Sequence, residues 1–189
     1  MLEFLRHTDH ALFHFVNTGL ANPVFDVLCP LFRHKFFWLP LYLLLAFIFY
    51  KRYGNKILLI GAFAALTVLL TDQLSSSLIK PLVHRLRPCN NFEVNARLLL
   101  DYCGAGYSFV SSHAANHFGI AMFLIPFLKH KKLAAALLFT WAFAIAFSQV
   151  YVGVHFPADV AGGAALGIFI GGLTALLAFK FIERNTRKN

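Results

Sequence analysis

The stretch SQVYVGVHFPAD, residues 148–159, separates two long apolar segments and carries the side chains that decide how this chain is interpreted. Pro157 suits the first turn of a helix, and Asp159 follows His155 by about one helical turn. A carboxylate at that spacing accepts the Nδ1–H of the imidazole and leaves Nε2 free as a nucleophile. A buried histidine–aspartate hydrogen bond without chemistry is the alternative. Beside membrane helices, however, ionisable groups are costly to keep and are functional by default.

The composition of the chain predicts an integral membrane protein. Of its 189 residues, 59% are hydrophobic and 13% are charged, whereas a soluble domain is about one-quarter charged. A helix needs about 20 apolar residues to cross a bilayer. Five segments come close to that length: 36–50, 57–79, 112–128, 133–152 and 157–182. We therefore expect an all-α fold, a helical bundle in which residues 1–189 form a single domain with about five transmembrane helices.

Residues 1–34 are expected to form short helices that lie in the membrane interface. Asp9 is interpreted as the cap of a first helix, and Asn22 with Pro23 as the start of a second. A sixth transmembrane span over residues 11–32 is the alternative, which the polar residues and the proline within it disfavour. The N-terminal sequence MLEFLRHTDH lacks the basic start and apolar stretch of a cleavable signal peptide.

The distribution of basic residues predicts the orientation of the bundle. The formal net charge is +9. Ten of the 17 Lys and Arg residues connect or follow apolar segments on one predicted side: Lys51, Arg52, Lys56, Lys129, Lys131, Lys132, Lys180, Arg184, Arg187 and Lys188. Such loops face the cytoplasm, so the stretch 148–159 faces the opposite side. Because topology accounts for these charges, we expect no nucleic-acid partner.

Two further stretches on the outward side carry anion-binding groups. In KPLVHRLRP, which begins at Lys80, Arg87 is seven residues further on, so a helical segment would direct both cations at one point. Snorkelling toward lipid headgroups is the alternative. In SFVSSHAAN, which begins at Ser108, Ser111 is predicted to cap a helix whose N–H groups form an anion site, and His113 is predicted to donate a proton there. Ordinary capping beside an interfacial histidine is the alternative.

Together the three stretches resemble the type 2 phosphatidic acid phosphatase superfamily, which also includes vanadium-dependent haloperoxidases. The family pattern is Lys-x6-Arg-Pro, then Pro-Ser-Gly-His, then Ser-Arg-x5-His-x3-Asp. The positions that match it are Lys80, Arg87, Pro88, Ser111, His113, Ser148, His155 and Asp159. Three positions depart from it, because Val110 and Ser112 replace the Pro and Gly of the second element and Gln149 replaces the Arg of the third.

The resemblance implies a catalytic set and a phosphate-binding set. His155 would attack phosphorus with Asp159 orienting it, and His113 would protonate the leaving alkoxide. No metal or other cofactor is expected. Backbone amides would bind the phosphoryl oxygens together with the side chains of Lys80, Arg87, Ser111, Ser112 and Gln149.

Because this chain has Gln149 where the family pattern has arginine, it lacks a fixed positive charge and the planar fork of the guanidinium. Losing one phosphate-binding cation costs on the order of 2–4 kcal/mol of transition-state stabilisation if nothing replaces it. Arg85, Arg97 and His84 are candidates to replace it, and the sequence does not choose between them. We expect activity to survive the exchange.

Two features outside the motifs concern the support of the site. Cys89 and Cys103 both fall in the outward loop over residues 80–112, where an oxidising compartment permits a disulfide that holds the loop over the site. Glycines four residues apart in the last apolar segment predict a close-packing face, within the bundle or between protomers: Gly163, Gly167 and Gly171.

The expected activity is metal-independent hydrolysis of a lipid phosphate monoester or lipid pyrophosphate through a phosphohistidine, at the outer face of the cytoplasmic membrane. A polyprenyl pyrophosphate, phosphatidylglycerol phosphate, phosphatidic acid and the phosphates of lipid A are all compatible substrates, and membrane lipids are the expected partners. A haloperoxidase is one rival, which the lipid-length spans disfavour. A non-catalytic phospholipid-binding or transport protein is the other, which leaves the pairing of His155 with Asp159 unexplained.

Overall fold

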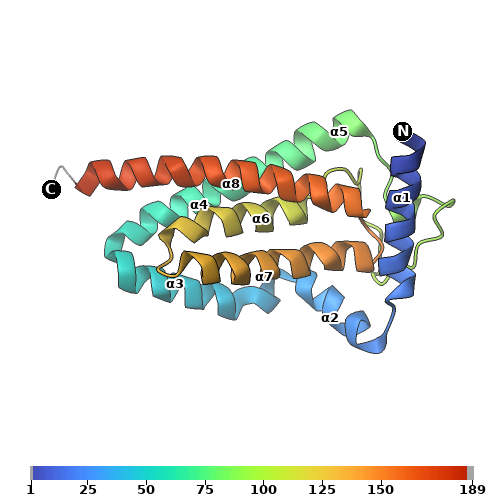
Figure 1. The fold of residues 1–189 in the computed structure, drawn as a ribbon, viewed down its shortest axis with the longest axis horizontal. Coiled ribbons are helices and arrows are strands. Elements are labelled where there is room, and N and C mark those ends of the chain that lie inside the picture. The colour runs from blue at the N-terminus through green and yellow to red at the C-terminus, as the bar shows by residue number, and fades with distance from the viewer. Residues whose placement is uncertain (1, 187–189) are drawn as a thin grey trace.

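The chain folds into a bundle of helices. The computed structural model describes the backbone of residues 2–186 and the side chains of residues 3–182, and within that part it contains no strand. The longer helices run along the long axis of the molecule (Figure 1). They are α3 (Leu39–Tyr53), α4 (Ile57–Gln73), α6 (Ser112–Leu124), α7 (Lys131–Tyr151) and α8 (Pro157–Thr186). The all-α fold expected from the sequence is confirmed.

Each predicted apolar segment overlaps one of these helices. By length and composition, three continuous helical runs are suited to cross a membrane: Lys35–Asn90, Lys131–Tyr151 and Pro157–Ile182. The first run includes both α3 and α4, which the turn Gly54–Lys56 separates. Helix α6 has 13 residues, fewer than the ~20 that a crossing needs. The number of five spans therefore stays a prediction.

Helix α6 is the inner helix of the bundle. Figure 1 shows it between α8 and α7, and it packs against α4 as well. A Cβ atom added at Gly163, Gly167 or Gly171 would overlap the backbone of α6 or of its cap residue Ser111. The glycine face of α8 therefore packs within the bundle, where only a hydrogen atom leaves room for the neighbouring backbone. This close approach fixes the first turn of α6, where His113 lies.

The N-terminal region forms two helices, of which α1 (Leu2–His14) lies at the end of the bundle where α7 connects to α8 (Figure 1). Helix α1 continues as a π-helical turn, and α2 (Pro23–Arg33) follows at an angle of 113°. The predicted start of α2 is confirmed, because the side chain of Asn22 accepts the N–H of Phe25 at 2.9 Å. The prediction that Asp9 caps the first helix of the N-terminal region is wrong. Asp9 is a buried residue within α1 and forms an ion pair with Arg85.

The two ends of the bundle differ in chemistry. The α3–α4 turn, the α6–α7 connection and the C-terminal end of α8 lie together at one end (Figure 1). These connections contain the basic residues counted above, although the side chains of Arg184, Arg187 and Lys188 lie outside the described residues. The opposite end carries α1, the long connection that precedes α6, and the α7–α8 turn. All three motif stretches reach this second end.

Candidate active site

The α7–α8 turn, at the same end of the bundle as α1, carries His155. Helix α7 ends at Tyr151, and Gly153 adopts a φ of +90°. A side chain at Gly153 would also clash with the carbonyl oxygen of Arg97, so this turn requires glycine. The ring of His155 is only 3% exposed.

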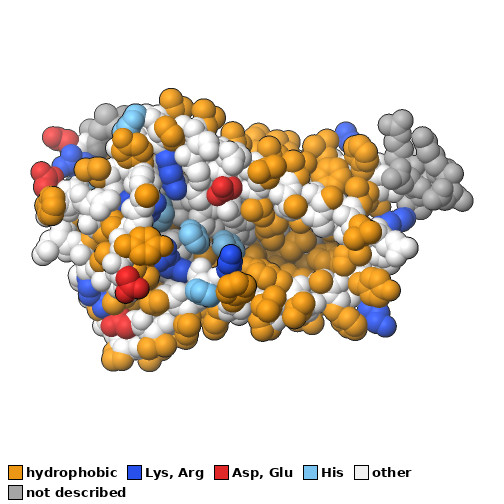
Figure 2. Space-filling view, turned by 180° about the vertical axis from the view of Figure 1, so that it is seen from behind, with side chains coloured by type: hydrophobic (Ala, Val, Ile, Leu, Met, Phe, Trp, Pro, Cys, Tyr) orange, Lys and Arg blue, Asp and Glu red, His pale blue; other side chains and the backbone are white. Residues whose placement is uncertain are grey.

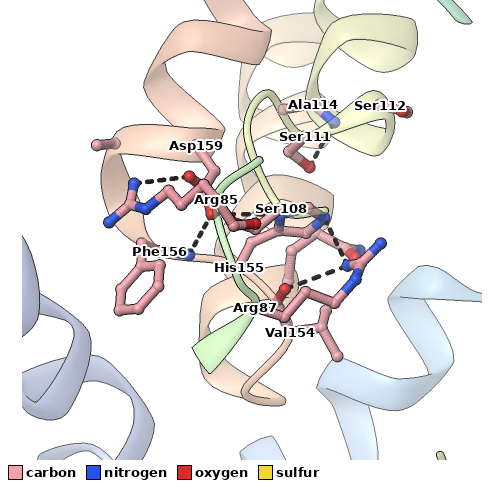
Figure 3. A network of polar contacts seen from close by, with 12 residues as sticks. Arg85, Arg87, Ser108, Ser111, Ser112, Ala114, Val154, His155, Phe156 and Asp159 are labelled. Carbon is pink, nitrogen blue, oxygen red and sulfur yellow. Dashed lines mark hydrogen bonds and ion pairs between the residues drawn. The ribbon is translucent and has the colours of Figure 1, made fainter. Parts of the chain in front are cut away.

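Asp159 lies directly behind the ring of His155. The carboxylate is fully buried; its Oδ2 accepts the N–H of Phe156 at 2.8 Å and lies 3.5 Å from Nδ1 of His155 (Figure 3). Its Oδ1 accepts a hydrogen bond from Arg85 at 2.7 Å. The other terminal nitrogen of Arg85 pairs with Asp9, whose Oδ1 accepts the N–H of Ala158. We call Asp9, Arg85 and Asp159 the rear cluster.

Arg87 contacts the opposite nitrogen of the same ring. Its NH1 lies 3.3 Å from Nε2 of His155 and donates to the carbonyl of Val154 at 3.2 Å (Figure 3). A guanidinium group only donates hydrogen bonds, so this contact requires an unprotonated Nε2. The ring proton then lies on Nδ1, toward Asp159. This is the tautomer in which Nε2 is a nucleophile.

The structure corrects the expected helical path from Lys80 to Arg87. Helix α5 (Lys80–Val83) ends at once, because His84 adopts the left-handed conformation with a φ of 55°. Arg87 is therefore delivered by an irregular segment. The two cations still line the same cavity.

Ser112 connects Lys80 to the π-helical turn Leu74–Ile79, which follows α4. Its Oγ accepts a hydrogen bond from Nζ of Lys80 at 3.0 Å. It also bonds to the hydroxyls of Ser75 and Ser76, at 2.9 and 3.1 Å. The serine at the position of the family glycine thus fixes the direction of the lysine.

Ser111 lies behind the cavity as the cap of α6. It is fully buried, its Oγ accepts the N–H of Ala114 at 3.5 Å, and its own N–H donates to the carbonyl of Asp159. These bonds hold the starts of α6 and α8 together. His117, one turn beyond His113, donates its Nδ1–H to the His113 carbonyl at 2.7 Å and packs against the ring of Trp141.

The remaining predicted residues line a single cavity of about 590 Å³. The side chains of His113 and His155 both line it, as the sequence analysis requires. The other predicted residues in its wall are Lys80, Arg87, Ser112 and Gln149. Figure 2 shows histidines and basic side chains grouped on one face, beside a hollow with hydrophobic walls. The arrangement suits an anion attached to an apolar group.

Comparison with known proteins assigns the family. The model of the PAP2 superfamily matches residues 61–183. The chain belongs to the PAP2 superfamily. It is 36% identical to the lipid A 4'-phosphatase of Bacteroides thetaiotaomicron, over 97% of this chain and 83% of that protein. It is 33% identical to phosphatidylglycerophosphatase B of Bacillus subtilis, over 71% of this chain and 64% of that protein.

Two solved PAP2 structures share the fold. The crystal structure of Aquifex aeolicus LpxE has a TM-score of 0.65 and 28% identity, and the match covers 87% of this chain and 92% of that one. A transmembrane PAP2-type phosphatidylglycerolphosphate phosphatase from Bacillus subtilis has the same TM-score and identity, with 95% and 87% covered. The chain is accordingly a multi-pass membrane hydrolase of the PAP2 lipid phosphatase family, as the sequence predicted.

The cation that accompanies Gln149 was not among the predicted candidates. Arg85 belongs to the rear cluster, Arg97 pairs with Asp26, and the ring of His84 packs edge-on against Tyr107. None of the three lines the cavity. Arg33 does line it, and its Nε donates to Oε1 of Gln149 at 3.1 Å.

We call Lys80, Arg87 and Arg33 the cavity cations. Sequence reasoning missed Arg33 because no PAP2 motif includes it. The one available signal is that a basic residue ends a largely apolar helix, α2.

A disulfide closes the loop beside the cavity. Cys89 and Cys103 are bonded, which confirms the prediction. Cys103 and the following Gly104 line the cavity, and the carbonyl of Ala105 accepts a hydrogen bond from Arg87 at 3.2 Å. The cross-link thereby holds the loop against a cavity cation.

The electrostatics of the site favour a neutral His155. Burial is the main cause and lowers the pKa of His155 from 6.5 to about 4. Asp159 opposes this shift, whereas the positive charge of Arg87 adds to it. The ring therefore carries no charge near pH 7 and keeps a lone pair on Nε2.

Proposed function

We propose that this PAP2 protein hydrolyses a lipid phosphate monoester, or a lipid pyrophosphate, through a phosphohistidine at His155. One observation carries the proposal. The imidazoles of His113 and His155 line one cavity with three cations, and a buried carboxylate stands behind His155. A non-catalytic lipid-binding protein needs the cations but has no use for an oriented, neutral imidazole.

The proposed reaction has two steps. In the first, Nε2 of His155 attacks phosphorus, the bond to the lipid oxygen breaks, and the imidazolium form of His113 gives its proton to that oxygen. In the second, water attacks phosphorus, His113 takes a proton from the water, and the phosphorus–nitrogen bond breaks to release phosphate. The cavity cations stabilise the equatorial oxygens in both steps. The proposal requires no metal, because the protein supplies the positive charge.

The relatives suggest which lipid to test first. Two relatives are named lipid A 4'-phosphatases, and the second, from Porphyromonas gingivalis, is 31% identical over 90% of this chain. The phosphatidylglycerophosphatase matches a smaller part of this chain. We propose a phosphorylated glycolipid such as lipid A as the preferred substrate and phosphatidylglycerol phosphate as the weaker one. A cavity of about 590 Å³ is large enough for a phosphate with part of a sugar.

The proposed location of the site is the outer face of the cytoplasmic membrane. The basic connections lie at the opposite end of the bundle, which by the positive-inside rule is cytoplasmic. The Cys89–Cys103 disulfide fits an oxidising compartment on the side of the site. We propose that α1 lies in the outer interface, because exposed Phe4 and Leu5 adjoin exposed Arg6. The lipid tail would occupy the hydrophobic hollow of Figure 2.

Phosphate release from a panel of lipids in detergent tests the proposal. The panel contains lipid A, phosphatidylglycerol phosphate, phosphatidic acid and a polyprenyl pyrophosphate. We expect release from at least one, fastest from lipid A, and loss of release in His155→Ala. Binding to these lipids without release from any of them would favour the lipid-binding alternative.

A further inference from the structure

Gln149 leaves the cavity without the arginine that the PAP2 pattern places there, and the structure shows a different arginine beside it. Gln149 lies on α7 and is fully buried. Arg33 is the last residue of α2, which packs against α7. The Nε of Arg33 donates to Oε1 of Gln149 at 3.1 Å, although 116 residues separate the two in sequence.

The geometry points to Arg33 as the third phosphate-binding cation, positioned by Gln149 in place of the motif arginine; this inference rests on the proposed phosphatase function. Arg33 and Gln149 both line the cavity that contains His113 and His155. The hydrogen bond to Gln149 uses Nε only, so both terminal NH₂ groups of the guanidinium remain to form a fork to two phosphoryl oxygens.

The charge balance around Arg33 supports a role in anion binding. Among the described residues no carboxylate forms an ion pair with Arg33, whereas Arg85 pairs with two and Arg97 with one. A partly buried guanidinium that neutralises no carboxylate is costly unless an anion joins it. Its partner here is a neutral amide, which fixes the direction of the guanidinium without reducing its charge.

The identity of residue 149 then has a simple physical reason. An arginine at position 149 beside Arg33 would place two guanidinium groups in contact, and like charges in a buried site repel strongly. Glutamine avoids that repulsion and supplies the acceptor that Arg33 needs. Arg33 and Gln149 therefore act as one unit, with Arg33 as the binding residue and Gln149 as the positioning residue.

Exchanging the two positions tests this inference. Arg33→Gln should lower kcat/KM on the order of 10²-fold and weaken competitive inhibition by orthovanadate, a phosphate-like oxyanion, by at least about tenfold. Arg33→Gln/Gln149→Arg should recover at least about tenfold of kcat/KM relative to Arg33→Gln, because the guanidinium returns from α7. Gln149→Ala should lower kcat/KM only about three- to tenfold, far less than His155→Ala.

Controls separate charge from folding. Lys35→Ala removes a neighbouring exposed cation that does not line the cavity, and it should leave kcat/KM and vanadate inhibition unchanged. Arg33→Lys keeps the charge and covers the case in which Arg33→Gln does not fold. Its kcat/KM and vanadate inhibition should lie between those of wild type and Arg33→Gln, because lysine has neither the planar fork nor the Nε donor of arginine. Melting temperatures of all variants report folding.

Two results would overturn the inference. The first is a folded Arg33→Gln variant whose kcat/KM and vanadate inhibition both lie within about threefold of those of Lys35→Ala. The other is a folded exchange variant no more active than Arg33→Gln. If His155→Ala remains inactive in either case, the proposed phosphatase function stands and only the role of Arg33 is lost. Phosphate release by His155→Ala would remove both.

Discussion

The two sides of the His155 ring hold positive charge in opposite ways. Behind the ring, the guanidinium of Arg85 is neutralised by Asp9 and Asp159. In front of it, the cavity cations bond to a hydroxyl, carbonyls and an amide, and among the described residues none of them forms an ion pair with a carboxylate. Paired charge fixes geometry, whereas unpaired charge is available to a substrate anion. Substitutions in the rear cluster should therefore lower kcat. Substitutions of the cavity cations should lower kcat and also weaken the affinity for phosphate.

Among substitutions in the rear cluster, Asp159→Asn is expected to have the largest effect on activity. The substitution removes the charge that favours the Nδ1–H tautomer and leaves Arg85 with one carboxylate instead of two. We expect kcat to fall on the order of 10³-fold while KM changes little. Steady-state phosphate release measures both. Glu93→Gln, which alters an exposed carboxylate paired with Arg6, is the matched control. A kcat within about tenfold of wild type would show that the rear cluster does not orient the nucleophile.

The second prediction concerns the pKa of His155, whose ring should be a weak base. Its lowered pKa of about 4 corresponds to roughly 300-fold weaker proton affinity than that of an ordinary histidine. The folded-state pKa lies below the ordinary value, so the ring stays neutral as the pH falls from 7 to 5 and takes up a proton only near pH 4. Histidine NMR of isotope-labelled protein in detergent, with His155→Gln to assign the resonance, measures this pKa. A value at or above 6.5 would contradict the proposed electrostatics.

A smaller effect is expected from Asp9→Asn. The amide oxygen still accepts the N–H of Ala158, but Arg85 loses one of its two carboxylates. A shift of Arg85 would move Asp159 slightly, so kcat should fall roughly tenfold. The melting temperature should also drop, because one partner of a buried ion pair has been removed. Unchanged kcat in a protein with a lowered melting temperature would limit Asp9 to a structural role.

The smallest effect is expected from removing the cross-link with Cys89→Ser/Cys103→Ser. A disulfide that closes a loop of this length contributes up to about 3 kcal/mol to stability. The variant should melt at a lower temperature but retain kcat within about threefold, since the catalytic histidines lie on α6 and in the α7–α8 turn, outside the closed loop. Mass spectrometry of protein purified without reductant checks the bond itself. Two free thiols there would contradict the structure.

The sequence predicted the long helices and the motif residues because both leave local signals. Apolar runs mark the helices, and the spacing of His155 and Asp159 matches one helical turn. The Asn22–Pro23 start of α2 was predictable for the same reason. The left-handed residue His84, which ends α5, was not, because a non-glycine residue rarely adopts a positive φ.

The contacts that support the site could not be predicted from local patterns. Arg33 and Gln149 are 116 residues apart, and Arg85 and Asp9 are 76 apart. No periodicity of the chain encodes such pairs; they arise when α1 and α2 pack against the ends of α7 and α8. The substitution at position 149 indicated that a compensating cation exists. The packing of α2 against α7 is the observation from which we infer that this cation is Arg33.

Trapping of a phosphorylated histidine tests most directly whether His155 is the nucleophile. With an aryl phosphate as substrate, the aryloxide leaves without needing a proton. His113→Ala should therefore still form the phosphohistidine but should hydrolyse it slowly. Mass spectrometry after an alkaline quench should then find the phosphate on His155 in His113→Ala and none in His113→Ala/His155→Ala. Phosphate on another residue, or turnover that persists in the double variant, would contradict the proposed mechanism.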